Sequence, residues 1–108
     1  MIQELTGLFR TSTDPFWALL RRLVRERGID PDTSLLADSF EDDVNFEFGI
    51  LVTDDRRVIQ YGVQYSGPSF NDGKLTEWKD ITELWSSSPY HREVSTALSI
   101  LDKPQNRE

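Results

Sequence analysis

The sequence predicts an α+β domain, a small antiparallel three- or four-stranded meander sheet flanked by an N-terminal and a C-terminal helix. Apolar residues recur with helical spacing near both ends of the chain, and they alternate with polar residues in runs between those ends. Parallel strands would need helical crossovers, and the segments between the predicted strands are too short for them. The 108 residues suit a single globular domain over 1–108, with the helices packed on one face of the sheet.

Two helices are expected before residue 30. The first is a short amphipathic segment that contains Ile2, Leu5, Leu8 and Phe9 and is interrupted by Gly7. The second begins at Asp14 and Pro15, an N-cap residue followed by a proline of the first turn. Its apolar stripe consists of Phe16, Leu19, Leu20, Leu23 and Val24. Gly28 ends this helix, and Ile29 is placed for the apolar contact of a Schellman-type end.

Residues 30–43 indicate an acidic connection with a short helix near Leu35 and Leu36, and a hairpin follows at 44–65. Alternating apolar residues on its two strands are Val44, Phe46, Phe48, Ile50 and Val52, then Ile59, Tyr61, Val63 and Tyr65. One shared face requires Val52 to oppose Ile59 and Phe48 to oppose Val63, with an even-numbered loop around 54–57. Gly49 then faces Gly62, and we expect a tryptophan side chain to cover that gap.

The remaining elements are a loop at 66–73, a third strand at 75–81 and a last helix. That helix is expected to begin at Ser88 and Pro89, and its apolar stripe runs from Tyr90 to Leu101 before Pro104 ends it. The predicted core consists of Phe16, Leu20, Leu23, Phe46, Phe48, Ile50, Val52, Ile59, Tyr61, Val63, Val94, Leu98 and Leu101.

The net charge of −7 comes from one segment. Residues 30–55 hold nine carboxylates and no Lys or Arg, whereas the rest of the chain carries a small positive excess. This segment repels phosphate backbones, which argues against nucleic acid and favours a basic protein partner. The chain has no cysteine, so thiolate metal sites and cysteine nucleophiles are excluded. No signal peptide pattern or apolar run of membrane-spanning length is present, and we expect a cytoplasmic protein that does not enter a membrane.

One stretch of the acidic segment has the oxygen spacing of a calcium loop. Residues 30–41 place oxygen side chains at positions 1, 3, 5, 9 and 12, and over these twelve residues the chain resembles an EF-hand loop. Leu35 occupies the position that needs glycine, Gly28 ends the entering helix too early, and a strand follows Glu41. We therefore predict no metal or other cofactor here, and expect Asp32 to cap a short helical turn.

Catalytic signatures are also missing. His91 is the only histidine, and no serine lies in a nucleophile motif, so we predict that His91 is a surface residue and that the protein is not an enzyme. Trp17 is expected at the flank of the core. Trp78 and Trp85 are candidates for recognition if they are exposed, because aromatic side chains dominate binding hot spots.

These observations favour a non-enzymatic, acidic protein-binding domain. The residues predicted to bind the partner are Asp38, Glu41, Asp42, Asp43, Glu47, Trp78 and Trp85. In size, acidity and lack of catalytic motifs the chain is similar to bacterial toxin-neutralising immunity proteins, a similarity of composition that involves no family motif. One alternative is a small-ligand binder or minor enzyme with a pocket between the sheet and the last helix, where His91, Tyr90 and Glu93 would lie near the mouth. A second alternative is a calcium-binding domain that uses residues 30–41.

Overall fold

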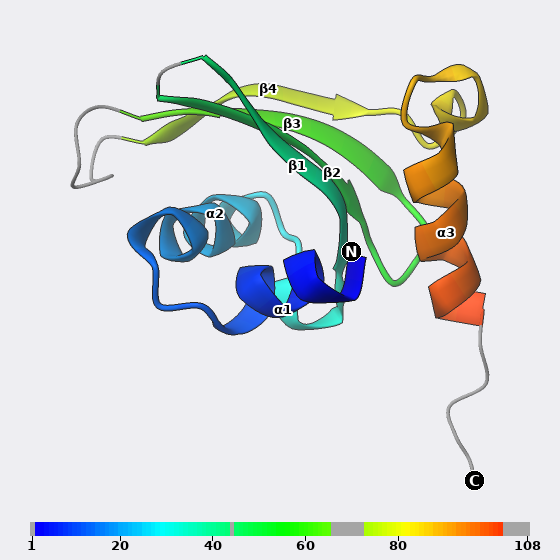
Figure 1. Cartoon of the computed structure of the whole chain (residues 1–108), viewed down its shortest axis with the longest axis horizontal. Coiled ribbons are helices and arrows are strands. Elements are labelled where there is room, and N and C mark those ends of the chain that lie inside the picture. The colour runs from blue at the N-terminus through cyan, green and yellow to red at the C-terminus, as the bar shows by residue number, and fades with distance from the viewer. Residues whose placement is uncertain (1, 44, 66–72, 103–108) are drawn as a thin grey trace, which may run out of the picture.

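A four-stranded antiparallel sheet forms the centre of the protein, and helices cover both of its faces (Figure 1). The computed structural model describes residues 2–43, 45–65 and 73–102, without the side chains of Asp42 and Asp43. The helices are α1 (Ile2–Thr11), α2 (Pro15–Glu26) and α3 (His91–Asp102), and single 3-10 turns are η1 (Pro31–Thr33) and η2 (Trp85–Ser87). The strands are β1 (Leu35–Asp43), β2 (Phe46–Val52), β3 (Val58–Gln64) and β4 (Lys74–Asp80), in the order β1-β2-β3-β4.

The N-terminal helices form as the sequence predicts. The Asp14 side chain accepts a hydrogen bond from the Phe16 N–H at 3.0 Å and so caps α2. Gly28 adopts a φ of +81°, and the N–H groups of Gly28 and Ile29 donate to carbonyls of the last turn at 2.9 and 3.0 Å. This is the Schellman arrangement, which a residue without a Cβ reaches at little cost.

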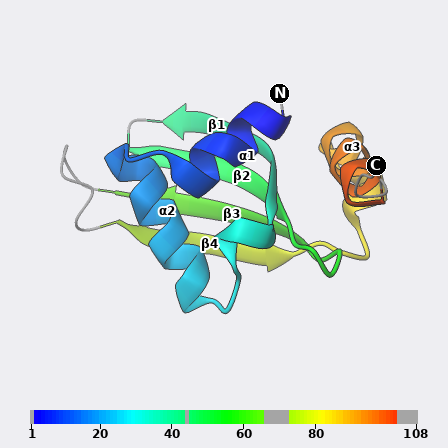
Figure 2. The same ribbon diagram turned by 90° about the horizontal axis from the view of Figure 1, so that it is seen from below.

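The helices do not share one face of the sheet. α1 and α2 lie on its concave side, and α3 lies on the convex side near the β2–β3 turn (Figures 1 and 2). Leu51 packs toward α1 and α2, whereas its neighbours Ile50 and Val52 belong to the cluster that includes Val94 of α3. The prediction of helices on one face is therefore wrong, because consecutive residues of one strand are buried on opposite sides.

The strand register also differs from the prediction by one residue. Val52 opposes Val58, Gly49 opposes Tyr61, and Phe48 opposes Gly62. Phe46, Phe48, Ile50 and Val52 consequently lie on the convex face, and Ile59, Tyr61 and Val63 lie on the concave face. The expected gap between two facing glycines does not exist, and no tryptophan is needed to fill it.

The turn between β2 and β3 explains the shifted register. It contains the five residues 53–57, an odd number, and Arg56 adopts a left-handed φ of 68°. Thr53 and Arg57 close the turn, since the Thr53 N–H donates to the Arg57 carbonyl at 2.9 Å. The three residues between Thr53 and Arg57 form the loop itself, and a left-handed residue in its last position is common in three-residue hairpin loops. Because the loop has an odd number of residues, the pairing is shifted by one position from the prediction.

The acidic connection contains a strand rather than a helix. Asp30, not Asp32, caps the 3-10 turn, because its side chain accepts from the Asp32 N–H at 2.9 Å. Leu35 and Leu36 begin β1, and each is buried on a different face of the sheet. The predicted short helix near these leucines is wrong. A strand points adjacent side chains to opposite faces, so both leucines can be buried when each face of the sheet is covered.

The last predicted strand and the last predicted helix are both present, with small differences in their bounds. The third predicted strand corresponds to β4, and α3 begins three residues after Ser88, whose hydroxyl accepts from the Tyr90 N–H at 3.1 Å. Val44 and most of the predicted loop at 66–73 lie outside the described residues. Nine of the predicted core residues are buried, and those that are only partly buried are Phe46, Phe48, Leu98 and Leu101. No helix in the described part of the chain is long and apolar enough to cross a bilayer.

Candidate binding surface

Four partly exposed aromatic rings form a row on the convex face, and Tyr90 at one end of it packs against the buried cluster around α3. We call Phe46, Phe48, Phe40 and Tyr90 the aromatic row. Phe40 and Phe48 are cross-strand neighbours with ring centroids 5.7 Å apart, and Phe46 stacks on Phe48 at 5.0 Å. Tyr90, which precedes α3, stacks on Phe40 at 6.1 Å. All four rings are partly exposed, so the row presents an apolar surface to solvent.

Gly62 makes room for the middle of the row. It lies opposite Phe48, and a Cβ atom at this position would come within 3.0 Å of Cε1 of the Phe48 ring. The absence of a side chain therefore lets the ring lie flat on β3, where an aromatic side chain compensates for the poor packing of a strand glycine.

Three carboxylates surround the Tyr90 end of the row. Burial raises the pKa of the Tyr90 hydroxyl, and the charges of Asp38, Glu77 and Glu93 raise it further. These carboxylates come from β1, β4 and α3. Within the described residues none of them forms an ion pair, although Glu77 accepts a long hydrogen bond of 3.4 Å from the Gln60 amide. The surface thus combines aromatic rings with unpaired negative charge.

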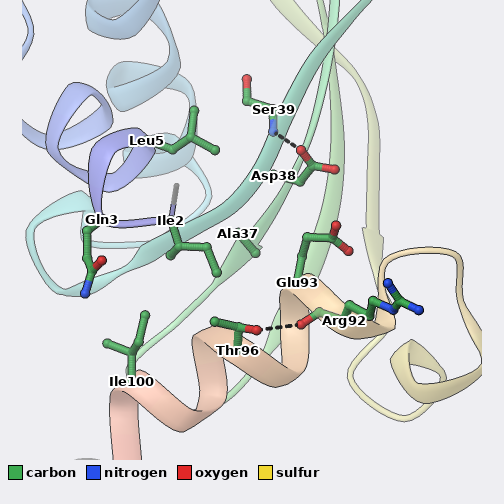
Figure 3. Close-up of a pocket in the computed structure, with 10 residues that line it drawn as sticks. All are labelled: Ile2, Gln3, Leu5, Ala37, Asp38, Ser39, Arg92, Glu93, Thr96 and Ile100. Carbon is green, nitrogen blue, oxygen red and sulfur yellow. Dashed lines mark hydrogen bonds between the residues drawn. The ribbon is translucent and has the colours of Figure 1, made fainter.

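A pocket of about 530 Å³ opens beside this end of the row, between α1, β1 and α3 (Figure 3). Its apolar lining consists of Ile2, Leu5, Ala37 and Ile100. Its polar lining consists of Gln3, Asp38, Ser39, Arg92, Glu93 and Thr96. Figure 3 shows the Glu93 carboxylate reaching from α3 toward Asp38 on β1, while the Arg92 guanidinium points away from both.

Asp38 is held in a partly desolvated position at this pocket. Burial raises the pKa of its carboxyl, and the nearby Glu93 charge raises it as well. The Ser39 N–H opposes this effect by donating to the carboxylate at 2.9 Å. Among the residues that the structure describes, no Lys or Arg forms an ion pair with Asp38 or Glu93, so a positively charged group beside these two carboxylates would lower the energy of both.

A second pair of carboxyl groups lies on the concave face. Glu41 and Glu47 oppose each other across β1 and β2, and burial together with the Glu41 charge and a hydrogen bond to Glu41 raises the pKa of Glu47 to about 7. Neighbouring carboxylates repel each other when both are charged, which favours the protonated form of the more buried group. Glu47 is the less exposed of the two.

The buried ring of Tyr61 lies beside this pair. Its side chain is 0% exposed, and its hydroxyl has no hydrogen-bond partner among the described residues. Burial raises the pKa of this hydroxyl, and the nearby Ser39 hydroxyl opposes that effect, although the two hydroxyls lack hydrogen-bond geometry. Burial also raises the pKa of Tyr65, to which Glu47 and Glu41 contribute.

The structure separates the residues that the sequence grouped as one binding surface. Asp38 lies on the convex face, whereas Glu41 and Glu47 lie on the concave face of the same two strands. Trp78 belongs to β4 at the other edge of the sheet, where it packs on the concave core. The Arg27 guanidinium lies over its ring, with Cζ 5.4 Å from the ring centroid. Trp85 packs in the cluster around α3. Asp42 and Asp43 belong to β1, but their side chains are outside the described part of the chain.

Other candidate residues are placed as follows. Trp17 is partly buried at the edge of the core, as expected, and His91 is exposed with its Nδ1 atom 3.1 Å from the Ser88 carbonyl oxygen. The calcium-like spacing is not a loop, because Asp38 and Glu41 lie on opposite faces of β1. No group of three or more His, Cys, Asp or Glu side chains surrounds a possible metal position in the residues that the structure describes.

A pocket between the sheet and the last helix, as the ligand-binding alternative expects, is present, and Glu93 lines it whereas His91 and Tyr90 do not. The sequence did not indicate Phe40 and Tyr90 as members of one aromatic surface. Phe40 stood in a segment interpreted as a linker, and Tyr90 was assigned to the apolar stripe of the last helix. The spacing of Phe40, Phe46 and Phe48 at even intervals is the signal that could have indicated one sheet face.

Comparisons of the chain with protein-family models, with curated proteins and with solved structures found no match.

Proposed function

We propose that this chain is a non-enzymatic binding domain whose convex face meets a basic protein partner. The observation that carries the proposal is the partly exposed aromatic row bordered by Asp38, Glu77 and Glu93. Aromatic side chains at the centre of an interface and charged groups at its rim are the usual arrangement in protein complexes. The class of binder that fits this chemistry is an inhibitor or immunity-type protein that neutralises a basic toxin.

Charge gives the proposed surface its selectivity. The negative segment 30–55 attracts a basic protein and accelerates the encounter, while it repels acidic proteins and nucleic acid. The aromatic row then supplies apolar area that is removed from water in the complex. In this division of roles the carboxylates govern the association rate, and the rings govern how long the complex survives.

A pull-down from an extract of the source cell tests the proposal with three baits. These are the native chain, Phe40→Ser with Phe46→Ser, and a control, Leu84→Ser, which removes an apolar side chain that is 59% exposed outside the row. We expect a basic protein to be retained by the native and control baits and lost by the double variant. Equal retention by all three baits, retention of acidic proteins only, or no protein that distinguishes the baits would contradict the proposal. Circular dichroism of each bait checks that it is folded.

A further inference from the structure

The pocket between α1, β1 and α3 combines an apolar floor, which the aromatic row does not use, with the carboxylates of Asp38 and Glu93, which also border the row. We propose that this pocket binds an organic cation, a molecule with an alkyl body and a terminal ammonium or guanidinium group. The proposal goes beyond the protein-binding function and does not depend on it, because a free amine could occupy the pocket in the absence of any partner.

Size and lining favour a small organic molecule. The volume of about 530 Å³ lies within the range of ordinary ligand pockets. Ile2 and Ala37 are buried beneath it, and Leu5 and Ile100 line its sides from α1 and α3. An alkyl chain on these four side chains would leave water, and such a transfer contributes a roughly constant free energy for each methylene group.

Charge selects the other end of the ligand. Asp38 and Glu93 reach the pocket from two different elements, and in the described residues no Lys or Arg side chain forms an ion pair with either. Arg92 is the cation on the rim, and its guanidinium points away from the two carboxylates (Figure 3). An ammonium group between the carboxylates would form charge-assisted hydrogen bonds and relieve their mutual repulsion. An anionic ligand is excluded by the same two charges.

Two of the other polar groups at the pocket already have hydrogen-bond partners. The Thr96 hydroxyl donates to the Arg92 carbonyl of its own helix at 2.9 Å, so it is already satisfied. The Ser39 N–H binds the Asp38 carboxylate and fixes its orientation toward the pocket. Asp38 is therefore positioned before the ligand arrives, which lowers the cost of ordering the site on binding.

Titration of the ¹⁵N-labelled chain with butylamine, hexylamine and octylamine, followed by NMR, tests the proposal. We expect saturable shifts at the amides of Ala37, Thr96 and Ile100, with an affinity that rises roughly fourfold for each added methylene until the floor is covered. Hexanol should bind at least about tenfold more weakly than hexylamine, because it lacks the charge. Saturable binding that is equal for alcohol and amine, or no saturable shift at these amides at millimolar amine, would overturn the proposal.

Variants separate this site from general attraction to an acidic protein. Asp38→Asn with Glu93→Gln should weaken hexylamine at least about tenfold, whereas Glu4→Gln with Glu83→Gln, which removes two exposed charges outside the pocket, should change it less than twofold. Equal effects of the two pairs would show that amines respond only to net charge and would overturn the site. Nα-acetyl-lysine methylamide is the last probe. Tighter binding than hexylamine assigns the pocket to a lysine side chain of a partner, and weaker binding assigns it to a free amine.

Discussion

Gly49→Ala is the substitution that most sharply tests the observed strand register. Gly49 lies opposite Tyr61, and a Cβ atom at position 49 would stand 2.2 Å from Oη, 2.4 Å from Cζ and 2.7 Å from Cε2 of the tyrosine. Carbon atoms in contact are separated by about 3.5–4.0 Å, so the rigid ring must retreat by more than about 1 Å. The ring is completely buried, so it can retreat only if the side chains around it move as well.

Overpacking of this kind costs about 1–3 kcal/mol, and the full burial of the ring places Gly49→Ala near the upper value. Alanine is better than glycine in a strand by about 0.5–1 kcal/mol, which leaves a net loss of about 2 kcal/mol. In a domain of about 100 residues this loss lowers the melting temperature by about 10 °C, measurable by urea titration and thermal denaturation. The register with Gly49 opposite Gly62 predicts the opposite sign, because no side chain would then be met.

A double-mutant cycle with Tyr61→Leu isolates the contact. Leucine lacks the distal ring atoms that approach Gly49, so Gly49→Ala in the Tyr61→Leu background should be neutral or slightly stabilising, and the coupling should be about 2 kcal/mol. Gly62→Ala is the matched control, since it meets the partly exposed Phe48 ring at 3.0 Å and should cost less than about 1 kcal/mol. A Gly49→Ala variant as stable as the native protein, or no coupling to Tyr61, would refute the register.

Two further predictions concern local chemistry. Because the pKa of Glu47 is raised to about 7 from an ordinary 4.5, the folded state holds this proton more tightly than the unfolded chain, so its contribution to stability is full below pH 4.5 and is lost as the pH rises through about 7. Glu47→Gln should therefore stabilise the protein at pH 8 and have little effect at pH 4.5 in urea titrations, and a pH-independent effect would contradict the raised pKa of Glu47. Arg56→Gly should stabilise the protein by up to about 1 kcal/mol in the same assay, because Arg56 has a φ of 68° and its ion pair with Asp102 is exposed. A loss of stability would show that the ion pair outweighs the strained turn.

The sequence predicted the elements of the fold better than their arrangement. Asp14, Pro15 and Gly28 carry strong local signals, because capping and left-handed backbone depend on one or two residues. The register depended on the assumption that one face of the hairpin is buried. That assumption fails here, since Ile50, Leu51 and Val52 are all buried between two layers of helices. Arg56 occupies the left-handed position of the turn, where glycine or asparagine is usual, so the sequence did not indicate a loop with an odd number of residues.

The candidate surface could be predicted only in part. Net charge identified segment 30–55 correctly as the acidic part of the chain, but charge along a sequence does not indicate which face of a strand presents it. Asp38 and Glu41 are three residues apart and lie on opposite faces of β1. The aromatic row brings together β1, β2 and the segment before α3, and the pocket requires α1 and α3 to approach the edge strand β1 from opposite faces of the sheet. Such long-range proximity follows from the packing of the helices, which local patterns do not specify.

The association rate, measured by stopped flow, shows whether the convex face attracts a basic partner, as we propose. With the partner from the pull-down, the convex pair Asp38→Asn and Glu77→Gln is compared with the concave pair Glu41→Gln and Glu47→Gln. The comparison is made at pH 8, above the raised pKa of Glu47. The Debye length is about 30 Å at 0.01 M and about 8 Å at 0.15 M ionic strength, so local charges are best compared at the higher value. We predict that the convex pair slows association at least about fivefold and that the concave pair has a clearly smaller effect. Equal rates for the two pairs, or an association rate of the native chain that does not change with salt, would contradict the claim.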